Sequence, residues 1–255
     1  KAWIMHNGMH QDKILKGYLG TGVQQYWEQA WAFEDESLVS PAPEYSSSAP
    51  NDAGPWPWRL LSYMDYDWRA LLFYDDLEWD NSDEYITEHA SQIATQPAFG
   101  YNGFYLGGWW EIDNHSGKPE AVFSRATLTD GRQLNVVTSL YSQIRKTNKQ
   151  IVFCSTFFAQ QGSHEERQDD VAGTYIAIPS VLARVNKWAP LPNRRVKATT
   201  DTFAPLGRFN GMPAICFADG STKNVELETL VDQSLWIPQA QQVGNFPASE
   251  FSHTQ

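Results

Sequence analysis

Apolar and polar residues alternate with a period of two from residue 103 onward, which is the pattern of half-buried β-strands. In residues 104–113 two sets of side chains face opposite ways: Phe104, Leu106, Trp110 and Ile112 against Tyr105, Trp109, Glu111 and Asp113. Asn-His-Ser-Gly at 114–117 predicts a turn, and Asp-Gly at 130–131 predicts a hairpin. Further strand-length segments follow: EAVFSRATLT, RQLNVVTSLYSQIR, QIVFCSTFFA, VAGTYIAIP, RRVKATTDTF, PAICFA and KNVELETLVDQSLWIP. The pattern predicts at least seven strands, mostly joined by short turns.

Spacing typical of helices comes earlier in the chain. Residues 9–31 carry an apolar stripe with a period of three to four, which predicts a helix bent near Gly20 and Gly22. Residues 81–96 begin with a capping-box pattern and predict another helix. Residues 36–57 are rich in Ser, Pro and Ala and predict an extended loop. Residues 58–76 fit a helix or two short strands.

Consecutive strands joined by short turns favour an antiparallel meander, which removes its edges by closing into a barrel. We therefore predict a mainly β, α+β chain overall. Residues 1–100 form a helical N-terminal cap that includes the loop at 36–57, residues 101–240 form an antiparallel β-barrel, and residues 241–255 form a polar tail. A β-sandwich is the alternative. The strand periodicity is similar to that of lipocalin-like barrels, and this resemblance implies an interior that holds one small ligand.

The composition excludes some partners and favours others. A net charge of −11 and a pI near 4.9 argue against binding to nucleic acid or to an anionic membrane. No stretch approaches the roughly 18 apolar residues of a membrane span. Aromatic residues make up 14% of the chain, which fits a large aromatic core or a ligand that is flat, apolar or a sugar ring. The chain begins without Met, so we expect a soluble protein that is secreted or organellar.

Two cysteines, Cys154 and Cys216, lie in apolar strand-like segments. Two cysteines are too few for a disulfide framework. They are expected to be either two buried free thiols or a disulfide between neighbouring strands.

The strand at 104–113 carries the main candidate site. Its Tyr105, Trp109 and Glu111 share one face beside the glycine pair 107–108, and such a pair marks a bend or the close approach of a ligand or another backbone. We predict acid–base roles for Glu111, Asp113 and Tyr141. Ligand contacts are predicted for Tyr105, Trp109, Trp110, Phe123, Arg125 and Arg145. If this face points to solvent instead, these are ordinary surface residues.

Glu111-Ile112-Asp113 resembles the Glu-x-Asp core of jelly-roll glucanases, and this resemblance implies a nucleophile and an acid–base carboxylate. Those enzymes place a second glutamate two or three residues after the aspartate. Here His115 and Ser116 hold those positions, and the next glutamate is Glu120. The acid–base residue is missing from its expected place.

His6 and His10 are four residues apart, but the intervening Asn-Gly argues against a helix and no third ligand is identifiable, so we predict no metal and no cofactor. The predicted function is binding of a hydrophobic or aromatic small molecule in a barrel pocket, with isomerisation or cyclisation as an associated chemistry. One alternative is a glycan-active hydrolase or lectin that uses tryptophan stacking and Glu111. The other is an accessory subunit of a larger assembly.

Overall fold

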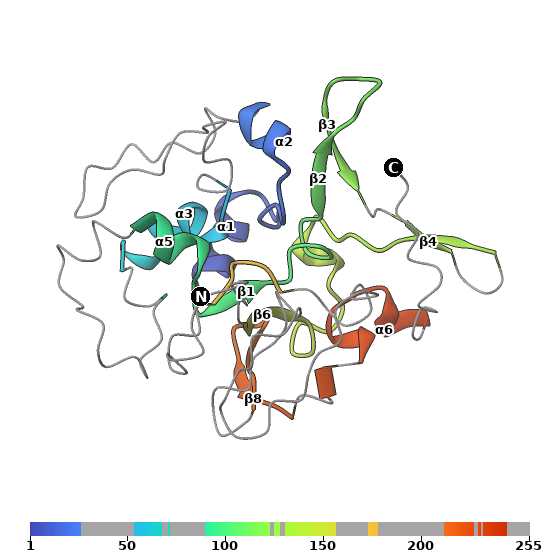
Figure 1. Ribbon diagram of the computed structural model, residues 1–255. Coiled ribbons are helices and arrows are strands. Elements are labelled where there is room, and N and C mark those ends of the chain that lie inside the picture. The colour runs from blue at the N-terminus through green and yellow to red at the C-terminus, as the bar shows by residue number, and fades with distance from the viewer. Residues whose placement is uncertain are drawn as a thin grey trace, which may run out of the picture.

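The computed structural model of the chain describes residues 1–26, 54–67, 71, 90–122, 125–127, 131–156, 173–177, 212–226, 229–230 and 232–243. Its helical elements are α1 (Ala2–Met9), α2 (Thr21–Tyr26), α3 (Trp56–Leu60), η2 (Leu61–Met64), α5 (Ala90–Thr95), η4 (Tyr141–Gln143), η7 (Gln233–Leu235) and α6 (Ala240–Val243). Its strands are β1 (Phe99–Tyr101), β2 (Trp109–Ile112), β3 (Pro119–Val122), β4 (Arg125–Thr127), β5 (Gln133–Asn135), β6 (Ile151–Ser155), β7 (Ala214–Phe217) and β8 (Thr222–Asn224). The protein is an α+β structure with antiparallel sheets and short helices (Figure 1).

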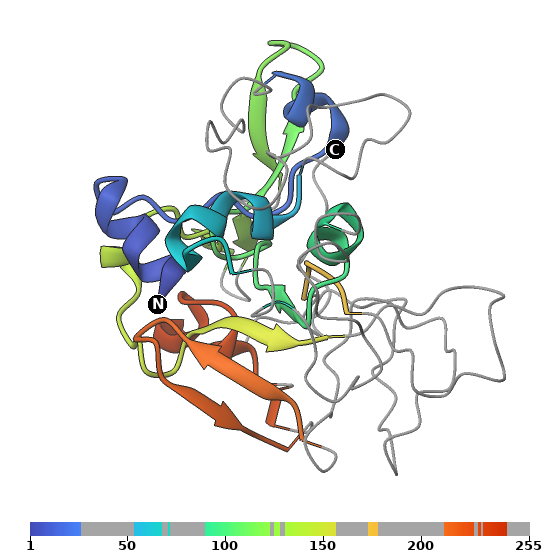
Figure 2. The ribbon, with the colours of Figure 1, turned by 90° about the vertical axis from the view of Figure 1, so that its left-hand side faces the viewer.

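The largest sheet has four strands in the order β1-β6-β7-β8, with every neighbouring pair antiparallel. β2 with β3 and β4 with β5 form two separate two-stranded sheets. The β2–β3 hairpin projects from the molecule at the opposite end from β8 (Figures 1 and 2). Because β1 pairs with β6, the large sheet does not follow the consecutive strand order of a simple meander. No sheet closes into a barrel among the described strands, so the lipocalin-like barrel and the sandwich stay predictions.

Short turns join three pairs of consecutive strands, as the sequence predicts for the turns at 114–117 and 130–131. The turn 114–117 joins β2 to β3, and the Asp113 N–H donates to the Lys118 carbonyl at 2.9 Å. Gly131, with a φ of +81°, lies between β4 and β5, and Gly220, with a φ of +85°, lies between β7 and β8. A positive φ is the conformation in which glycine has no steric penalty, so these turns follow directly from local sequence.

The predicted helix over 9–31 is wrong in its centre. The chain instead forms α1, an extended stretch and then α2, and the Asn-Gly pair expected to prevent a helix lies inside α1. Gln11 and Asp12 have positive φ values of 55° and 70°, which end the first helix. The extended stretch gains backbone hydrogen bonds instead: the Ile14 N–H donates to the Ser139 carbonyl at 2.9 Å, and the Gly20 N–H to the Trp110 carbonyl at 2.8 Å.

Four further segments can be compared with the predicted pattern. The strand predicted over 223–238 ends at Asn224, and Asp232 caps η7 by accepting from the Ser234 N–H at 2.9 Å. The strand predicted over 132–145 ends at Asn135 and is followed by η4. The ambiguous segment from residue 58 is helical as far as Met64, and α5 lies within the helix predicted over 81–96. Residues 36–53 of the loop predicted over 36–57 and the strand predicted over 194–203 lie outside the described residues. The end of that predicted loop is instead helical, because α3 begins at Trp56.

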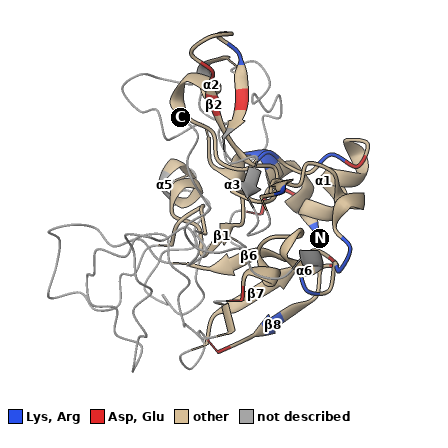
Figure 3. Cartoon of the chain, turned by 90° about the vertical axis from the view of Figure 1, so that its right-hand side faces the viewer, with Lys and Arg blue, Asp and Glu red and all other residues tan. Residues whose placement is uncertain are grey.

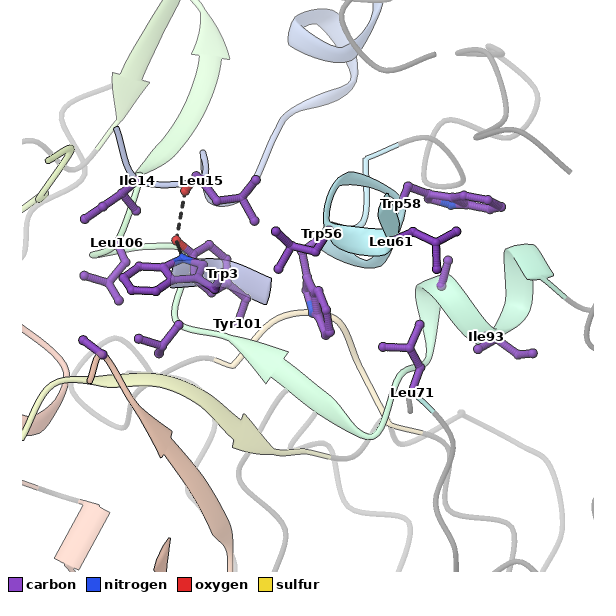
Figure 4. Packing of buried hydrophobic residues seen from close by; sticks show 14 of the residues in the cluster. Trp3, Ile14, Leu15, Trp56, Trp58, Leu61, Leu71, Ile93, Tyr101 and Leu106 are labelled. Atoms are coloured by element: carbon purple, nitrogen blue, oxygen red, sulfur yellow. Dashed lines mark hydrogen bonds between the residues drawn. The ribbon is translucent and has the colours of Figure 1, made fainter. Parts of the chain in front are cut away.

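The first hydrophobic cluster joins the early helices to the large sheet (Figure 4). Its tryptophans also make hydrogen bonds: the Trp3 indole donates to the Tyr101 hydroxyl at 3.2 Å, and the Trp56 indole donates to the Phe99 carbonyl at 3.2 Å. The Tyr101 hydroxyl donates in turn to the Leu15 carbonyl at 2.9 Å. The helices before residue 100 therefore share one core with β1 and β6. None of the described helices is long and apolar enough to cross a membrane.

A second hydrophobic cluster lies between the sheet and the segment 230–240, and it is centred on Trp236, Tyr105 and Ile151. Buried Asn102 connects the two parts, because its side-chain amide donates to the carbonyls of Ile151 and Trp236, each at 2.9 Å. The Trp236 indole donates to the Leu230 carbonyl at 2.7 Å. This pairing of buried polar groups fixes the C-terminal segment against β6.

Both cysteines are free thiols, which confirms the first of the two expected alternatives. They lie on neighbouring strands, but Cys154 is opposite Ile215 while Cys216 is opposite Phe153. Adjacent register positions face opposite sides of a sheet, so the two sulfur atoms point apart. Cys154 is buried, whereas Cys216 is half-buried and not buried as expected.

Candidate functional site

Two of the residues predicted to form a site, Trp109 and Glu111, lie in β2. Trp109 and Glu111 lie on one side of this strand, both half-buried, and the Trp109 indole N–H donates to Glu111 Oε1 at 2.7 Å. The carboxylate packs over Gly20, where an added Cβ would lie 1.9 Å from Glu111 Oε2. The segment around Leu19 pairs with Trp110 in a parallel bridge, which places Gly20 against the strand. The glutamate is therefore fixed by an indole N–H on one side and by the backbone on the other.

Three aromatic rings lie beside this glutamate. Tyr18 and Phe104 are stacked with ring centroids 6.3 Å apart, and Trp109 meets them edge-on at 5.3 Å and 5.4 Å. Burial and, second, the negative charge of Glu111 raise the pKa of the Tyr18 hydroxyl. We call Tyr18, Phe104, Trp109 and Glu111 the hairpin site. It offers one fixed carboxylate beside aromatic edges.

The glycine pair forms the predicted bend, and the bend corrects the predicted strand face. Gly107 and Gly108 have φ values of +83° and +82°, so the strand begins only at Trp109. An added Cβ at Gly107 would lie 2.0 Å from the Leu15 carbonyl oxygen, which identifies another backbone as the close neighbour. Tyr105 therefore does not share a strand face with Glu111. It is fully buried in the second hydrophobic cluster, and this burial raises its pKa.

Trp110 lies on the other face of β2. Its indole N–H donates to the Gly107 carbonyl at 2.6 Å, and the Lys16 ammonium lies 4.0 Å above the ring centroid. Burial and, second, the nearby Arg59 charge lower the pKa of Lys16 to about 8. Arg59 itself is buried and donates to the carbonyls of Lys16, Gly17 and Gly54. Burial lowers its pKa to about 10, so it stays charged at neutral pH.

Sequence reasoning missed the position of Glu120. In the β2–β3 register Glu120 lies directly opposite Glu111, and acidic side chains lie on both strands of this hairpin (Figure 3). Directly opposite residues share a face, with Cβ atoms about 5 Å apart. The signal was available, because two residues separate each glutamate from the turn 114–117. The structure thus brings a second carboxylate to Glu111 across the hairpin.

The remaining predicted residues do not converge on this site. Asp113 accepts from the Ser116 N–H at 2.7 Å and the His115 N–H at 3.3 Å, so it is a turn residue. Hydrogen bonding by the Ser116 side chain and then by these N–H groups lowers its pKa. Tyr141 begins η4, donates to the Ala218 carbonyl at 3.2 Å and lies 5.8 Å from Trp3 between ring centroids. Arg145 is exposed in the bend after η4.

Two further residues, Arg125 and Phe123, were predicted to contact the ligand. Arg125 lies in β4, opposite Asn135. Phe123 lies outside the described residues.

A separate apolar cavity of about 120 Å³ lies between the early helices and the large sheet. Residues of α1, α3, η2, β6, β7 and the turn after β7 line it: Lys1, Ala2, Trp3, Ile4, Trp56, Leu60, Met64, Val152, Phe153, Cys216, Phe217 and Gly220. Trp56 and Phe153 form an aromatic wall, with centroids 4.7 Å apart at 56°. We call this space the apolar cavity. None of the residues predicted from sequence as site residues lines it.

In the described part of the chain, no group of three or more His, Cys, Asp or Glu side chains is placed to hold a metal ion. Comparison of the chain with protein-family models, with curated proteins and with solved structures found no match.

Proposed function

We propose that the chain binds a small hydrophobic molecule with a single aromatic ring in the apolar cavity. The observation that carries this proposal is a space of about 120 Å³ with aromatic and aliphatic walls. An apolar cavity of about 150 Å³ in another protein stays dry and binds benzene. The space here is of the same order, so it has room for one ring.

The wall chemistry supports an apolar ligand over a polar one. Eleven of the twelve lining residues are apolar or glycine, and Lys1 is the single charged one. Burying about 150 Å² of ring surface at about 25 cal/mol per Å² contributes about 4 kcal/mol, which corresponds to a Kd of about 1 mM. Binding is therefore expected at millimolar concentrations of simple ring compounds, and more tightly for a natural ligand with further contacts.

This position differs from the barrel interior expected from sequence. The closed lipocalin-like barrel remains a sequence-based prediction, and binding in the apolar cavity does not require it. The cavity lining offers shape and apolar contact without an acid–base pair, because Glu111, Asp113 and Tyr141 lie elsewhere. An isomerisation or cyclisation in this cavity would thus depend on confinement of the substrate.

Calorimetry with toluene, phenol and cyclohexanol tests this proposal. We expect toluene to bind most tightly, because it has no hydroxyl group that loses its hydrogen bonds to water. Cys216→Leu fills part of the cavity and is expected to abolish binding, whereas Cys216→Ala enlarges the space and retains it. Equal binding of toluene by both variants would place the ligand elsewhere.

A second candidate function is carbohydrate binding or hydrolysis at the hairpin site. The specific observation in its favour is the register that sets Glu120 opposite Glu111, beside the half-buried Trp109. Glycosidases use two carboxyl groups about 5–9 Å apart, and aromatic rings stack on sugar faces. The sequence pattern lacked the second glutamate along the strand, but the hairpin supplies one across it.

Variants of the two hairpin glutamates test the carbohydrate proposal without changing the apolar cavity. Glu111→Gln and Glu120→Gln should each lower hydrolysis of a β-glucan by at least about 100-fold if both carboxyl groups act. Glu226→Gln, an exposed glutamate away from the hairpin, is the control. Hydrolysis that persists in both hairpin variants would exclude the glycosidase proposal. This result would say nothing about toluene binding, because the apolar cavity is a different site.

A further inference from the structure

Two histidines lie at the C-terminal end of α1: His6 is in its last turn and His10 is its C-cap. His6 and His10 are one helical turn apart, and their ring centroids are 4.3 Å apart with an angle of 30° between the planes. The spacing i, i+4 on a helix is the arrangement in which two imidazoles bind one metal ion. Imidazole nitrogens lie about 2.0–2.1 Å from a bound zinc ion, so two adjacent rings can share one ion when a nitrogen of each points to it.

Each imidazole has one nitrogen engaged by a neighbour, which leaves the other for a ligand. His6 Nδ1 lies 3.3 Å from Asn7 Oδ1, so Nε2 is the remaining nitrogen. His10 Nε2 lies 3.1 Å from the Tyr63 hydroxyl, so Nδ1 is the remaining nitrogen. Metal-bound histidines typically hold their second nitrogen in this way, since the hydrogen bond fixes the tautomer and the ring orientation. Tyr63 also meets the His6 ring edge-on at 5.6 Å.

We propose that His6 and His10 together bind one divalent transition-metal ion through His6 Nε2 and His10 Nδ1. Imidazole suits Cu²⁺, Ni²⁺ and Zn²⁺, and the general order of divalent affinities places Cu²⁺ first. Water completes the coordination, because no third His, Cys, Asp or Glu joins the pair among the described residues. This site is independent of the apolar cavity and of the hairpin site.

The charges around the pair decide how strongly it binds. His6 is half-buried and His10 is exposed, so an ion can reach the pair from the His10 side. The nearby positive charge of Arg59 opposes a second cation. Asn7 and Tyr63 are uncharged. The balance gives a site of moderate affinity, with Cu²⁺ favoured over Zn²⁺.

Titration of the full chain with CuCl₂ and with ZnCl₂, followed by calorimetry and by electron paramagnetic resonance of Cu²⁺, tests the proposal. We expect one Cu²⁺ signal with two nitrogen ligands, and a loss of affinity of about tenfold or more in His6→Gln and in His10→Gln. Tyr63→Phe should weaken binding less than either. The matched control is His115→Gln, because His115 is exposed and lies on the β2–β3 turn.

His10 is exposed, so His10→Gln is expected to fold as the natural chain does. A single nitrogen ligand in the natural chain, or affinity that His10→Gln leaves unchanged, would overturn the proposal. An equal loss in His115→Gln would do the same, because it would assign the effect to exposed imidazole in general. A two-nitrogen signal that disappears in both α1 variants and persists in the control supports it.

Discussion

Gly107 lies at a close backbone crossing near the candidate site, because an added Cβ would face the Leu15 carbonyl where residues 15–17 pass the bend before β2. Gly107→Ala adds a methyl group 2.0 Å from that oxygen at a φ of +83°. We expect a loss of about 3 kcal/mol or more in unfolding free energy, from the clash and the left-handed conformation together. Urea denaturation measures this loss.

Gly117→Ala is the control for that substitution. Its φ is +66°, but no atom lies within 4 Å of an added Cβ. Only the conformational term of about 1 kcal/mol then remains. Similar losses in the two variants would contradict the close backbone contact at Gly107.

Arg59 is the second residue on which this region depends. Its buried guanidinium donates to three backbone carbonyls from two segments, which a lysine ammonium cannot reproduce because it lacks the planar fork. We expect Arg59→Lys to lower the unfolding free energy by about 2 kcal/mol or more. Exposed Arg145→Lys should change it by less than about 0.5 kcal/mol. Equal small effects in chemical denaturation of the two variants would contradict a structural role for Arg59.

At the scale of elements, α1 is expected to lose stability in acid. Burial favours the neutral imidazole of His6 and lowers its pKa from 6.5 to about 4. Between these values the unfolded chain holds more protons than the folded one, so stability falls as pH drops from about 6.5 to about 4. We expect the urea midpoint of His6→Gln to fall less over this range than that of the natural chain.

His115→Gln controls for the loss of an imidazole, because that side chain is 98% exposed. Its urea midpoint should follow the natural chain across the same pH range. A His6→Gln variant with the natural pH dependence would contradict the burial of His6.

The register of the β2–β3 hairpin places two negatively charged residues directly opposite each other, and their repulsion is expected to destabilise the hairpin. Glu120 lies opposite Glu111, whose carboxylate accepts from the Trp109 indole. Removal of the charge at Glu120 should therefore stabilise the hairpin by about 0.5 kcal/mol, within the usual range for cross-strand pairs. Thermal unfolding of Glu120→Gln against Glu226→Gln measures this difference. No gain, or an equal gain in both, would contradict the proximity of the two glutamates.

Local sequence predicted the hairpins better than any other element. The turn at 114–117 and the glycines at 131 and 220 determine their strands without help from distant residues. The helix predicted over 9–31 was wrong because the extended stretch before Gly20 gains backbone pairing with Ser139 and Trp110. Propensity along the chain carries no information about such partners, which lie more than 80 residues away.

The same limit applies to the whole molecule. Periodicity identified strand segments, but it could not reveal that β1 pairs with β6 across about 50 residues. The residues predicted to form one site lie in different parts of the structure, because the sequence pattern did not reveal how distant segments pair. Trp109 and Glu111 share a face as predicted, whereas Tyr105 is buried in the second cluster and Tyr141 lies beside Trp3. The apolar cavity is built by α1, α3 and β6–β7, which no single stretch of sequence brings together.

A crystal structure of the chain soaked with bromobenzene tests the proposed ligand site most directly, because anomalous scattering locates the bromine atom. We expect one strong peak in the apolar cavity, next to Trp56, Phe153 and Cys216, which all line it. The peak should be absent in Cys216→Leu and present in Cys216→Ala. A peak at the hairpin site, or no peak in the cavity of the natural chain, would contradict the proposed function.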